Sequence, residues 1–466
     1  MRKVKTRRTF LAGTTAAGAL ALAGCTGGSD DDPSDSDDGA TDQPSGDDAD
    51  DGTGSSDGPE RVAHEVWALD QGTDTIYLYE PTEEGYLDGS DPYDHAETID
   101  LNDLLDDDGP IVPHMIDYSG DYAYAAIACT AGARTLIFRT EDHELVADLE
   151  TGAGSHMAAF SPDDEYVHVD AIGEEAIVRV DVDLDAESFE IVDELAIHED
   201  ETVQDAGIEG GAPICHQYAP DGRSLHTLGP SYHDGALVIV DHESFSVERA
   251  YGHDEYPTNC GTMPHPTEEK FYLTAGLPSD PDSGEEGVGD LYIYDTAEDE
   301  LRLGPKSTGG IDAHGFWFTP DGEELWVLNR ETNDGIVWNP DWDQPQSEIE
   351  AFGPATGDEP AERDAPDIMW ATPDGAYMLV TLRGPAPLSG DPHAATGVTP
   401  GFSILDTETK EIVTVVEPDP IDAYDDADIE AARNEEDGAP SIPDFHGIGV
   451  RPLEDVDAEI GTSPPY

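Results

Sequence analysis

Positive charge is the scarcest property of this chain. Lys and Arg contribute 20 residues against 106 Asp and Glu, which gives a formal net charge of −86. A nucleic-acid-binding surface needs clustered Lys and Arg to neutralise phosphates, so this composition excludes DNA and RNA as partners. Self-repulsion on this scale destabilises a compact state, and a Debye length of about 3 Å near 1 M salt removes most of that penalty. The acidity therefore predicts a halophilic surface that is charged for solvation.

Cysteine is also rare, and the usual catalytic motifs are missing. No Cys-x-x-Cys pair, haem-attachment motif, phosphate-binding loop or serine nucleophile elbow occurs in the sequence. The chain has four cysteines. If Cys25 is lipidated, three thiols remain in an oxidising exterior. Cys215 and Cys260 either form a disulfide or bind a soft metal, whereas Cys129 follows an apolar strand and is expected to be an inert core thiol.

The apolar run near the N-terminus is short for a membrane span, which takes about 20 residues. Residues 1–25 are instead a predicted targeting segment, with Arg7-Arg8 ahead of Phe10 and Leu22-Ala23-Gly24-Cys25 at its end. The paired arginines resemble a twin-arginine export signal, and the ending resembles a lipobox. These resemblances imply export, cleavage before Cys25 and lipidation of its thiol. The mature chain would then be anchored in the membrane, at the outer face of the cytoplasmic membrane.

Residues 26–60 have no aromatic or large aliphatic side chain and consist almost wholly of Asp, Gly, Ser, Thr and Pro. Such a segment cannot bury a core, so we expect a disordered, self-repelling acidic tether. Residues 61–466 are expected to form the folded domain.

A strand–turn–strand pattern repeats along this domain. His314–Leu328 is its clearest copy, with an apolar strand, a Pro-Asp-Gly turn and a second strand. Seven copies at spacings of roughly 40–80 residues suit the four-stranded blades of a propeller. The turns are Ser119-Gly120-Asp121, Ser161-Pro162-Asp163, Pro220-Asp221-Gly222, Pro266-Thr267-Glu268, Pro320-Asp321-Gly322, Pro373-Asp374-Gly375 and Arg451-Pro452.

The two ends of the domain are predicted to complete one blade together. The N-terminal strands have no inner strand before them, and the last apolar strand, Gly447–Val450, has no partners after it. Pairing this strand with Glu65–Leu69 would close the ring without a free sheet edge. The expected fold class is therefore all-β, a seven-bladed β-propeller closed by its N- and C-terminal strands.

The repeat resembles that of a known family. A Pro-Asp-Gly turn, a strand ending near Asn329 and a strand that runs into Asp406-Thr407-Glu408-Thr409 make it similar to the YVTN-repeat (YncE-like) seven-bladed propellers. The resemblance covers about Glu65–Pro452 and implies the fold. It leaves the activity open, because such folds host binding proteins, lactonases and redox enzymes alike.

One position in the repeat is rich in histidine. It lies six residues before the proline of each turn, or before Gly120 in the first copy. Histidine occupies four of the seven copies, although the whole chain has only 16 His among 466 residues. Inner strands of a propeller start at the mouth of its channel, so these side chains should converge there. The aligned residues are His114, His156, Ile214, Cys260, His314, Asp367 and His446.

Imidazole, thiol and carboxylate groups are the ligands of borderline metals, so the mouth is a candidate site for copper first and zinc second. Cys215 and His216, next to the aligned position of their own blade, extend the candidate set. The multi-histidine mouth is similar to the copper-bearing propeller of nitrous oxide reductases, although no motif of that family matches residue by residue. We therefore expect a monomeric, lipid-anchored propeller that binds a metal ion or a small ligand, with a redox role left open.

Two other functions fit the same sequence. A metal-free module could bind a protein or a glycan through the loop-rich face of the propeller. A lactonase-like hydrolase would need a carboxylate-rich calcium site instead of histidines. In either case, a histidine at the start of a blade could simply cap the sheet by bonding a neighbouring carbonyl.

Overall fold

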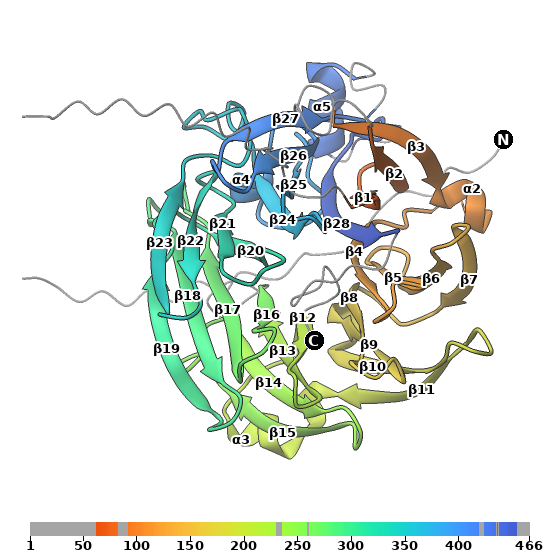
Figure 1. Cartoon of the computed structure of the whole chain (residues 1–466), viewed down its shortest axis with the longest axis vertical. Helices are drawn as coiled ribbons and strands as arrows, with labels where there is room; N and C mark the ends of the chain where they lie inside the picture. Colours follow the sequence, from red (N-terminus) through yellow and green to blue (C-terminus); the bar gives the residue numbers. More distant parts are fainter. Residues whose placement is uncertain are drawn as a thin grey trace, which may run out of the picture. The chain divides into compact units, whose positions relative to one another are not determined.

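The computed structural model describes residues 62–82, 92–107, 109–229, 235–258, 261–418, 424–434, 436 and 438–453. In these ranges the chain forms seven four-stranded sheets around a common centre (Figure 1). This arrangement confirms the predicted all-β, seven-bladed propeller. The targeting segment 1–25 with Cys25, the tether 26–60 and Cys260 lie outside the described residues.

Six blades each use four consecutive strands, ordered from the inner strand to the outer one. The strands of blades 2 to 4 are β4 (Pro113–Tyr118), β5 (Tyr124–Cys129), β6 (Arg134–Arg139), β7 (Glu144–Leu149), β8 (Ser155–Phe160), β9 (Tyr166–Ala171), β10 (Ala176–Asp183), β11 (Ser188–Ala196), β12 (Ala212–Tyr218), β13 (Arg223–Gly229), β14 (Ala236–Asp241) and β15 (Ser246–Tyr251). Those of blades 5 to 7 are β16 (Thr262–Pro264), β17 (Lys270–Leu277), β18 (Val288–Asp295), β19 (Glu300–Ser307), β20 (Ala313–Phe318), β21 (Leu325–Asn329), β22 (Asp334–Asn339), β23 (Gln344–Ile349), β24 (Pro366–Ala371), β25 (Tyr377–Leu382), β26 (Gly401–Asp406) and β27 (Ile412–Val416).

Blade 1 is built from both ends of the domain. Its inner strand β28 (Phe445–Pro452) pairs antiparallel with β1 (His64–Asp70), and β2 (Thr75–Pro81) and β3 (Tyr93–Asp100) follow outward. Val66 lies opposite Val450 in this register. The predicted closure of the ring is therefore confirmed, and it leaves neither β1 nor β28 with an unpaired edge at the junction.

Helices are few and short. They connect strands or lie in the long loops: α2 (Leu101–Leu105), η1 (Ile172–Glu174), η2 (Ile197–Glu199), α3 (Glu201–Asp205), α4 (Pro392–Ala395) and α5 (Asp426–Arg433). Within the described ranges, no helix has both the length and the apolar character needed to cross a membrane.

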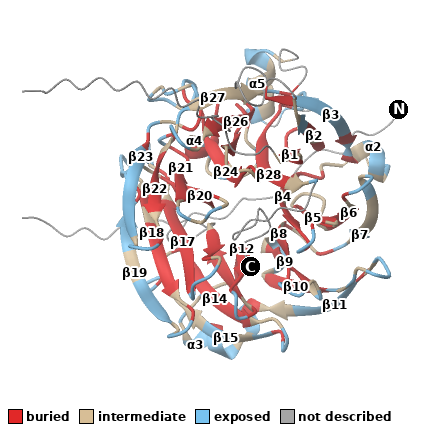
Figure 2. Cartoon of the chain, in the orientation of Figure 1, coloured by how far each residue is buried: buried red, intermediate tan, exposed pale blue. Residues whose placement is uncertain are grey.

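Burial decreases from the centre of the ring to its rim (Figure 2). In blade 6, for example, the inner strands β20 and β21 are almost wholly buried, whereas five of the six residues of the outer strand β23 are exposed. The apolar core lies between neighbouring blades: Met263 and Ile293 of blade 5 pack in one cluster with Phe316 and Val327 of blade 6. The acidic side chains can therefore occupy the outer strands and remain in solvent, as expected for a surface charged for solvation.

The repeated turn has a hydrogen-bonding reason for its sequence. The Ser161 hydroxyl donates to Asp163 Oδ1 at 2.7 Å, and the same oxygen accepts the backbone N–H of Glu165 at 3.2 Å. Thr319 and Asp321 form the equivalent bond at 2.6 Å. Ser or Thr followed two residues later by Asp thus fixes the hairpin between the inner strand and the second strand.

Candidate functional site

In six of the seven blades, the inner strand breaks its pairing with the second strand at the same place. The register of β4 skips between Pro113 and Met115, and that of β8 skips between Ser155 and Met157. Such a β-bulge leaves one residue unpaired and redirects its side chain. Bulges in the described blades contain the aligned residues His114, His156, Ile214, His314, Asp367 and His446. The repeated position of the sequence is therefore a bulge position of the structure.

Glycines beside these bulges let the inner strands approach one another. A Cβ atom on Gly315 would lie 2.3 Å from the carbonyl oxygen of Asp367, and one on Gly447 would lie 2.5 Å from that of His114. No side chain fits at such distances from a backbone atom. The glycine of one blade thus allows the backbone of the next blade's bulge residue to pack against it. This close approach brings the aligned side chains of neighbouring blades together.

The four aligned histidines form one cluster. His114 Nε2 lies 2.7 Å from His156 Nε2, so the two rings share one hydrogen. The rings of His114 and His446 are stacked with centroids 3.7 Å apart, and the centroids of His314 and His446 lie 6.2 Å apart. His114, His314 and His446 are at most 3% exposed, whereas His156 is partly exposed. The convergence expected from the sequence is present, and four different blades supply it.

His446 and Asp367 face each other with one hydrogen-bond acceptor each. His446 Nδ1 donates to the carbonyl oxygen of His114 at 3.0 Å, so this nitrogen carries the hydrogen of the neutral ring. The other ring nitrogen, Nε2, lies 3.5 Å from Asp367 Oδ2. A lone pair facing a carboxylate is unfavourable unless a cation lies between them. Two ligands bound to one ion at roughly 2.0–2.1 Å are separated by about this distance.

Asp367 is also the centre of a buried ion network. Its Oδ2 atom accepts a hydrogen bond from Arg383 at 2.6 Å, and its Oδ1 atom lies 3.3 Å from Arg330 Nη1. Arg383 also pairs with Asp444 at 2.8 Å, and Arg330 with Asp312 at 2.8 Å. All five side chains are at most 1% exposed. This network fixes the carboxylate of Asp367. His314 Nδ1 donates to the backbone carbonyl oxygen of Asp367 at 3.3 Å and lies 2.9 Å from its Oδ1 atom.

These contacts set the charges of the cluster. Burial, with His156 and His446 nearby, holds the pKa of His114 well below its ordinary value. Burial likewise holds the pKa of His446 well below its ordinary value. Burial raises the pKa of Asp367, but the surrounding imidazole and guanidinium groups outweigh burial and hold it well below its ordinary value. At neutral pH, His114 and His446 are therefore neutral imidazoles beside the ionised carboxylate of Asp367, which is the state that binds metals.

Sulfur lines the channel next to the histidines. Cys215 Sγ lies 3.7 Å from His156 Nδ1. Cys215 also lines a cavity of about 60 Å³, together with His314, Met115, Met157 and Met263. The whole chain has only six methionines, so three of them at one cavity is a marked concentration. Cys260, which the sequence also placed at this mouth, lies outside the described residues, and the alternative of a Cys215–Cys260 disulfide stays open.

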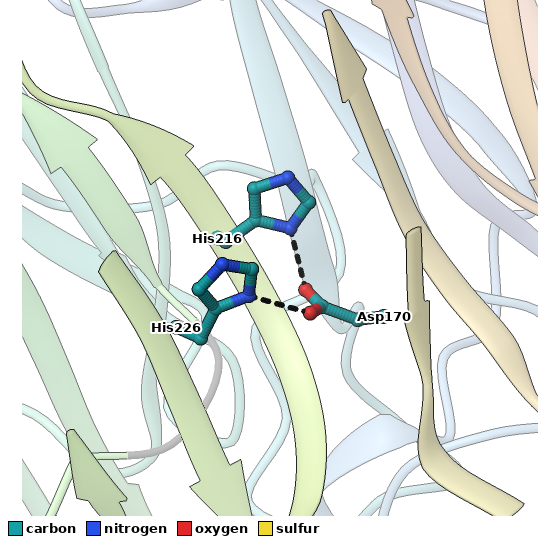
Figure 3. A group of neighbouring side chains, drawn as sticks. All are labelled: Asp170, His216 and His226. Atoms are coloured by element: carbon teal, nitrogen blue, oxygen red, sulfur yellow. Dashed lines mark hydrogen bonds and ion pairs between the residues drawn. The ribbon is translucent and has the colours of Figure 1, made fainter. Parts of the chain in front are cut away.

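His216 belongs to a different cluster, between blades 3 and 4. Its Nδ1 atom lies 2.7 Å from Asp170 Oδ2, and the Nδ1 atom of His226 lies 2.7 Å from Asp170 Oδ1. Figure 3 shows both imidazole rings turned towards the carboxylate of Asp170. All three side chains are 0% exposed. We refer to Asp170, His216 and His226 as the inter-blade cluster.

The inter-blade cluster has an unusual charge state for a protein interior. Burial raises the pKa of Asp170, but the two imidazoles outweigh it and hold that pKa below its ordinary value. Burial lowers the pKa of His226 to about 4. A carboxylate therefore lies deep in the protein, and one of its hydrogen-bond donors, His226, is a neutral imidazole at neutral pH.

Sequence reasoning missed Asp170 and His226. Two signals could have found them. His168 and Asp170 are two residues apart in a strand and so share one face of it. His216 and His226 flank a Pro-Asp-Gly turn at a spacing that makes them directly opposite in the hairpin, as the register shows.

Comparisons with known proteins bear on the fold. No protein-family model matches the sequence, and no curated protein matches it by sequence. A solved protein from Lactobacillus plantarum is similar with a TM-score of 0.54 and 13% identity, over 84% of this chain and 100% of that one. A functionally unknown protein from Desulfotomaculum acetoxidans gives 0.52 and 11%, over 84% and 99%. Hydrazine synthase from Kuenenia stuttgartiensis gives 0.48 and 12%, over 73% and 86%.

At these identities the likeness shows the propeller fold alone. The fold hosts many unrelated activities, so function has to be argued from the channel and its side chains. The similarity to YVTN-repeat propellers remains a resemblance of the repeat.

Proposed function

We propose that this protein binds a copper ion at the histidine-lined mouth of its propeller channel. The observation that carries the proposal is the convergence of His114, His156 and His446, from three blades, with Asp367 and Cys215 beside them. Neutral imidazoles, a carboxylate and a thiol from rigid strands form a ligand set that is already assembled in the fold.

Two pairs of facing atoms in the cluster indicate where a cation would bind. His446 Nε2 and Asp367 Oδ2 face each other across 3.5 Å, a separation that fits two ligands of one ion. His114 Nε2 and His156 Nε2 are 2.7 Å apart, closer than two ligands of one ion, so a metal would replace their shared hydrogen and move the rings apart. His156 is the partly exposed ring, and so the one with room to turn.

The sulfur atoms favour copper over zinc. Thioethers are soft ligands that select Cu(I), whereas structural zinc sites use thiolate, imidazole and carboxylate. Met115, Met157 and Met263 line the same cavity as Cys215. A site that holds Cu(I) with sulfur and imidazole can also stabilise Cu(II) through its nitrogens, so a redox role is compatible with the ligand set.

The cellular setting of the proposal comes from the sequence. The twin-arginine-like segment and the lipobox-like ending support export and lipidation of Cys25, with the acidic tether between the lipid and the propeller. The proposed function is therefore metal binding at the outer face of the cytoplasmic membrane, by a monomer.

Metal loading tests the proposal directly. The full chain, purified in high salt without a His tag and treated with chelator, is loaded anaerobically with Cu(I) and separately with Zn(II), and bound metal per chain is measured. We expect about one copper per chain in the wild type, and loss of it in His114→Ala and His156→Ala. His198→Ala is the matched control, because His198 is 44% exposed and makes only ion pairs at 3.4 Å and 3.9 Å with two glutamates.

The same experiment separates the alternatives. Copper well below one per chain in the loaded wild type would favour the metal-free interaction module. A lactonase-like calcium site has less support from the channel, because calcium takes several oxygen ligands and Asp367 is the one carboxylate among the aligned residues.

A further inference from the structure

We infer that the inter-blade cluster of Asp170, His216 and His226 is a second metal site, separate from the channel, which holds a zinc ion between blades 3 and 4. This goes beyond the proposed copper site, because it uses other residues, another metal and another part of the fold.

The strands position the three ligands rigidly. Asp170 is in β9 of blade 3, and His216 and His226 form a directly opposed pair on β12 and β13 of blade 4. Their ligand atoms all lie within 4.8 Å of one another. The Nδ1–oxygen distances of 2.7 Å are those of hydrogen bonds, and ligands of a tetrahedral zinc lie roughly 3.3 Å apart. The cluster therefore needs to open by well under 1 Å per contact to admit the ion.

No arginine or lysine in the described ranges pairs with Asp170. Within the described part of the chain, the ion pairs of Asp170 are those with His216 and His226, whereas the equally buried Asp367 is held by two arginines. Burial of a carboxylate without a cationic partner is costly. A zinc ion would give Asp170 a cationic partner with a fixed charge.

Unpartnered nitrogen atoms surround the cluster. His216 Nε2 and His168 Nε2 are both buried and have no hydrogen-bond partner among the residues that the structure describes. The His168 ring, which is also 0% exposed, lies with its centroid 6.2 Å from those of His216 and His226. Buried imidazoles that serve only the fold normally have both nitrogens satisfied. His168 is accordingly the candidate fourth ligand, which would complete the tetrahedral set of a structural zinc site.

Ser224 provides a hydrogen-bond partner for the second ring nitrogen of His226, as a metal-binding histidine usually has. Its Oγ atom lies 2.8 Å from His226 Nε2. If zinc binds Nδ1 of His226, the ring hydrogen moves to Nε2 and is donated to this hydroxyl. The cluster can thus exchange its hydrogen bonds to Asp170 for metal bonds without leaving the His226 ring unsatisfied.

Metal content of the full chain tests the inference. Protein produced in cells supplied with zinc, and purified in high salt without chelator, should carry one zinc per chain. Asp170→Asn should lose that zinc and keep the copper of the channel, whereas Cys215→Ser and His156→Ala should keep the zinc. His242→Gln is the control, because His242 is on blade 4 but bonds Gly222 and Asp163 instead. The two proposals can therefore fail independently.

A measurement on the wild type covers the case in which Asp170→Asn does not fold. Protein produced with Co(II) in place of zinc should show the intense visible bands of a tetrahedral ion without the near-ultraviolet charge-transfer band of a cobalt–thiolate bond. Zinc in the wild type no higher than in folded Asp170→Asn would overturn the inference. Absence of tetrahedral Co(II) bands would overturn it as well.

Discussion

Cys215 and His216 are neighbours in β12 and face two different clusters. Cys215 Sγ lies 3.7 Å from His156 Nδ1 at the channel, whereas His216 Nδ1 lies 2.7 Å from Asp170 Oδ2 between the blades. Alternation of side chains along a strand accounts for the division. One inner strand therefore contributes a soft ligand to the proposed copper site and an imidazole to the inferred zinc site.

The pH dependence of copper binding should reflect the low pKa values of the channel histidines. Because burial holds the pKa of His114 and of His446 well below 6.5, protons compete with the metal only at lower pH than for a solvent-exposed imidazole. We expect copper to stay bound through pH 6 and to be released as the pH falls further. Copper per chain, measured after gel filtration between pH 7.5 and 4, checks this. Release centred at or above pH 6.5 would contradict it.

Removal of Arg383 should destabilise the protein strongly. Arg383 is 0% exposed and pairs with both Asp367 and Asp444, so Arg383→Met leaves two carboxylates without their principal cation. Breaking a buried pair in this way costs about 3–5 kcal/mol in the free energy of unfolding. Denaturant unfolding in high salt measures the loss. Arg249→Met is the control, since Arg249 is 54% exposed and should change stability by less than about 1 kcal/mol.

His143 should make stability depend on pH above neutrality. Its ring bonds Glu65 at 2.9 Å and Glu97 at 2.8 Å, and the bond to Glu65 contributes most to raising its pKa to about 8. A pKa raised above the unfolded value of about 6.5 gives stability that is complete below pH 6.5 and is lost as the pH rises through 8. The contribution should be about 1 kcal/mol after allowance for solvent screening at the half-exposed Glu97.

The test of this contribution compares the Tm of the wild type and of His143→Gln at pH 6 and pH 9. The wild type should lose more stability than the variant over this interval. Equal losses in the two proteins would show that His143 does not titrate as described.

Closure of the ring should be required for cooperative unfolding. A chain that ends after Asp444 lacks β28, so β1 loses its partner and blade 1 has an open inner edge. We expect this truncated chain to unfold at a much lower temperature or to aggregate. A chain that ends after Leu453 retains β28 and should behave as the full chain does. Cooperative unfolding of the shorter chain at the full-length Tm would argue against the role of β28.

Added salt should stabilise the protein steeply. With a formal net charge of −86, self-repulsion opposes folding until the Debye length falls to about 3 Å near 1 M salt. The Tm should therefore rise with KCl from low concentration to about 1 M and then level off. A Tm that is independent of KCl over this range would contradict the halophilic interpretation of the sequence.

The sequence by itself determined the repeat and therefore the fold. Ser or Thr followed by Pro-Asp-Gly fixes a hairpin through local hydrogen bonds, such as that of Thr319 to Asp321, and these bonds depend on residues within five positions of one another. Counting back from the turn also found the bulge residues His114 and His446, because the distance from hairpin to bulge is set within a single strand. Closure followed from the same local pattern at Glu65–Leu69 and Gly447–Val450.

Only the tertiary structure decided which side chains meet. The sequence places Asp367 at the channel mouth, but only the folded chain brings Arg330 and Arg383, which follow the second strands of blades 6 and 7, to its oxygens. Asp170 is one acidic residue among 106, and nothing local distinguishes it until blades 3 and 4 bring it to His216 and His226. Contacts between blades depend on the twist and spacing of whole sheets, which the pattern of one strand does not contain.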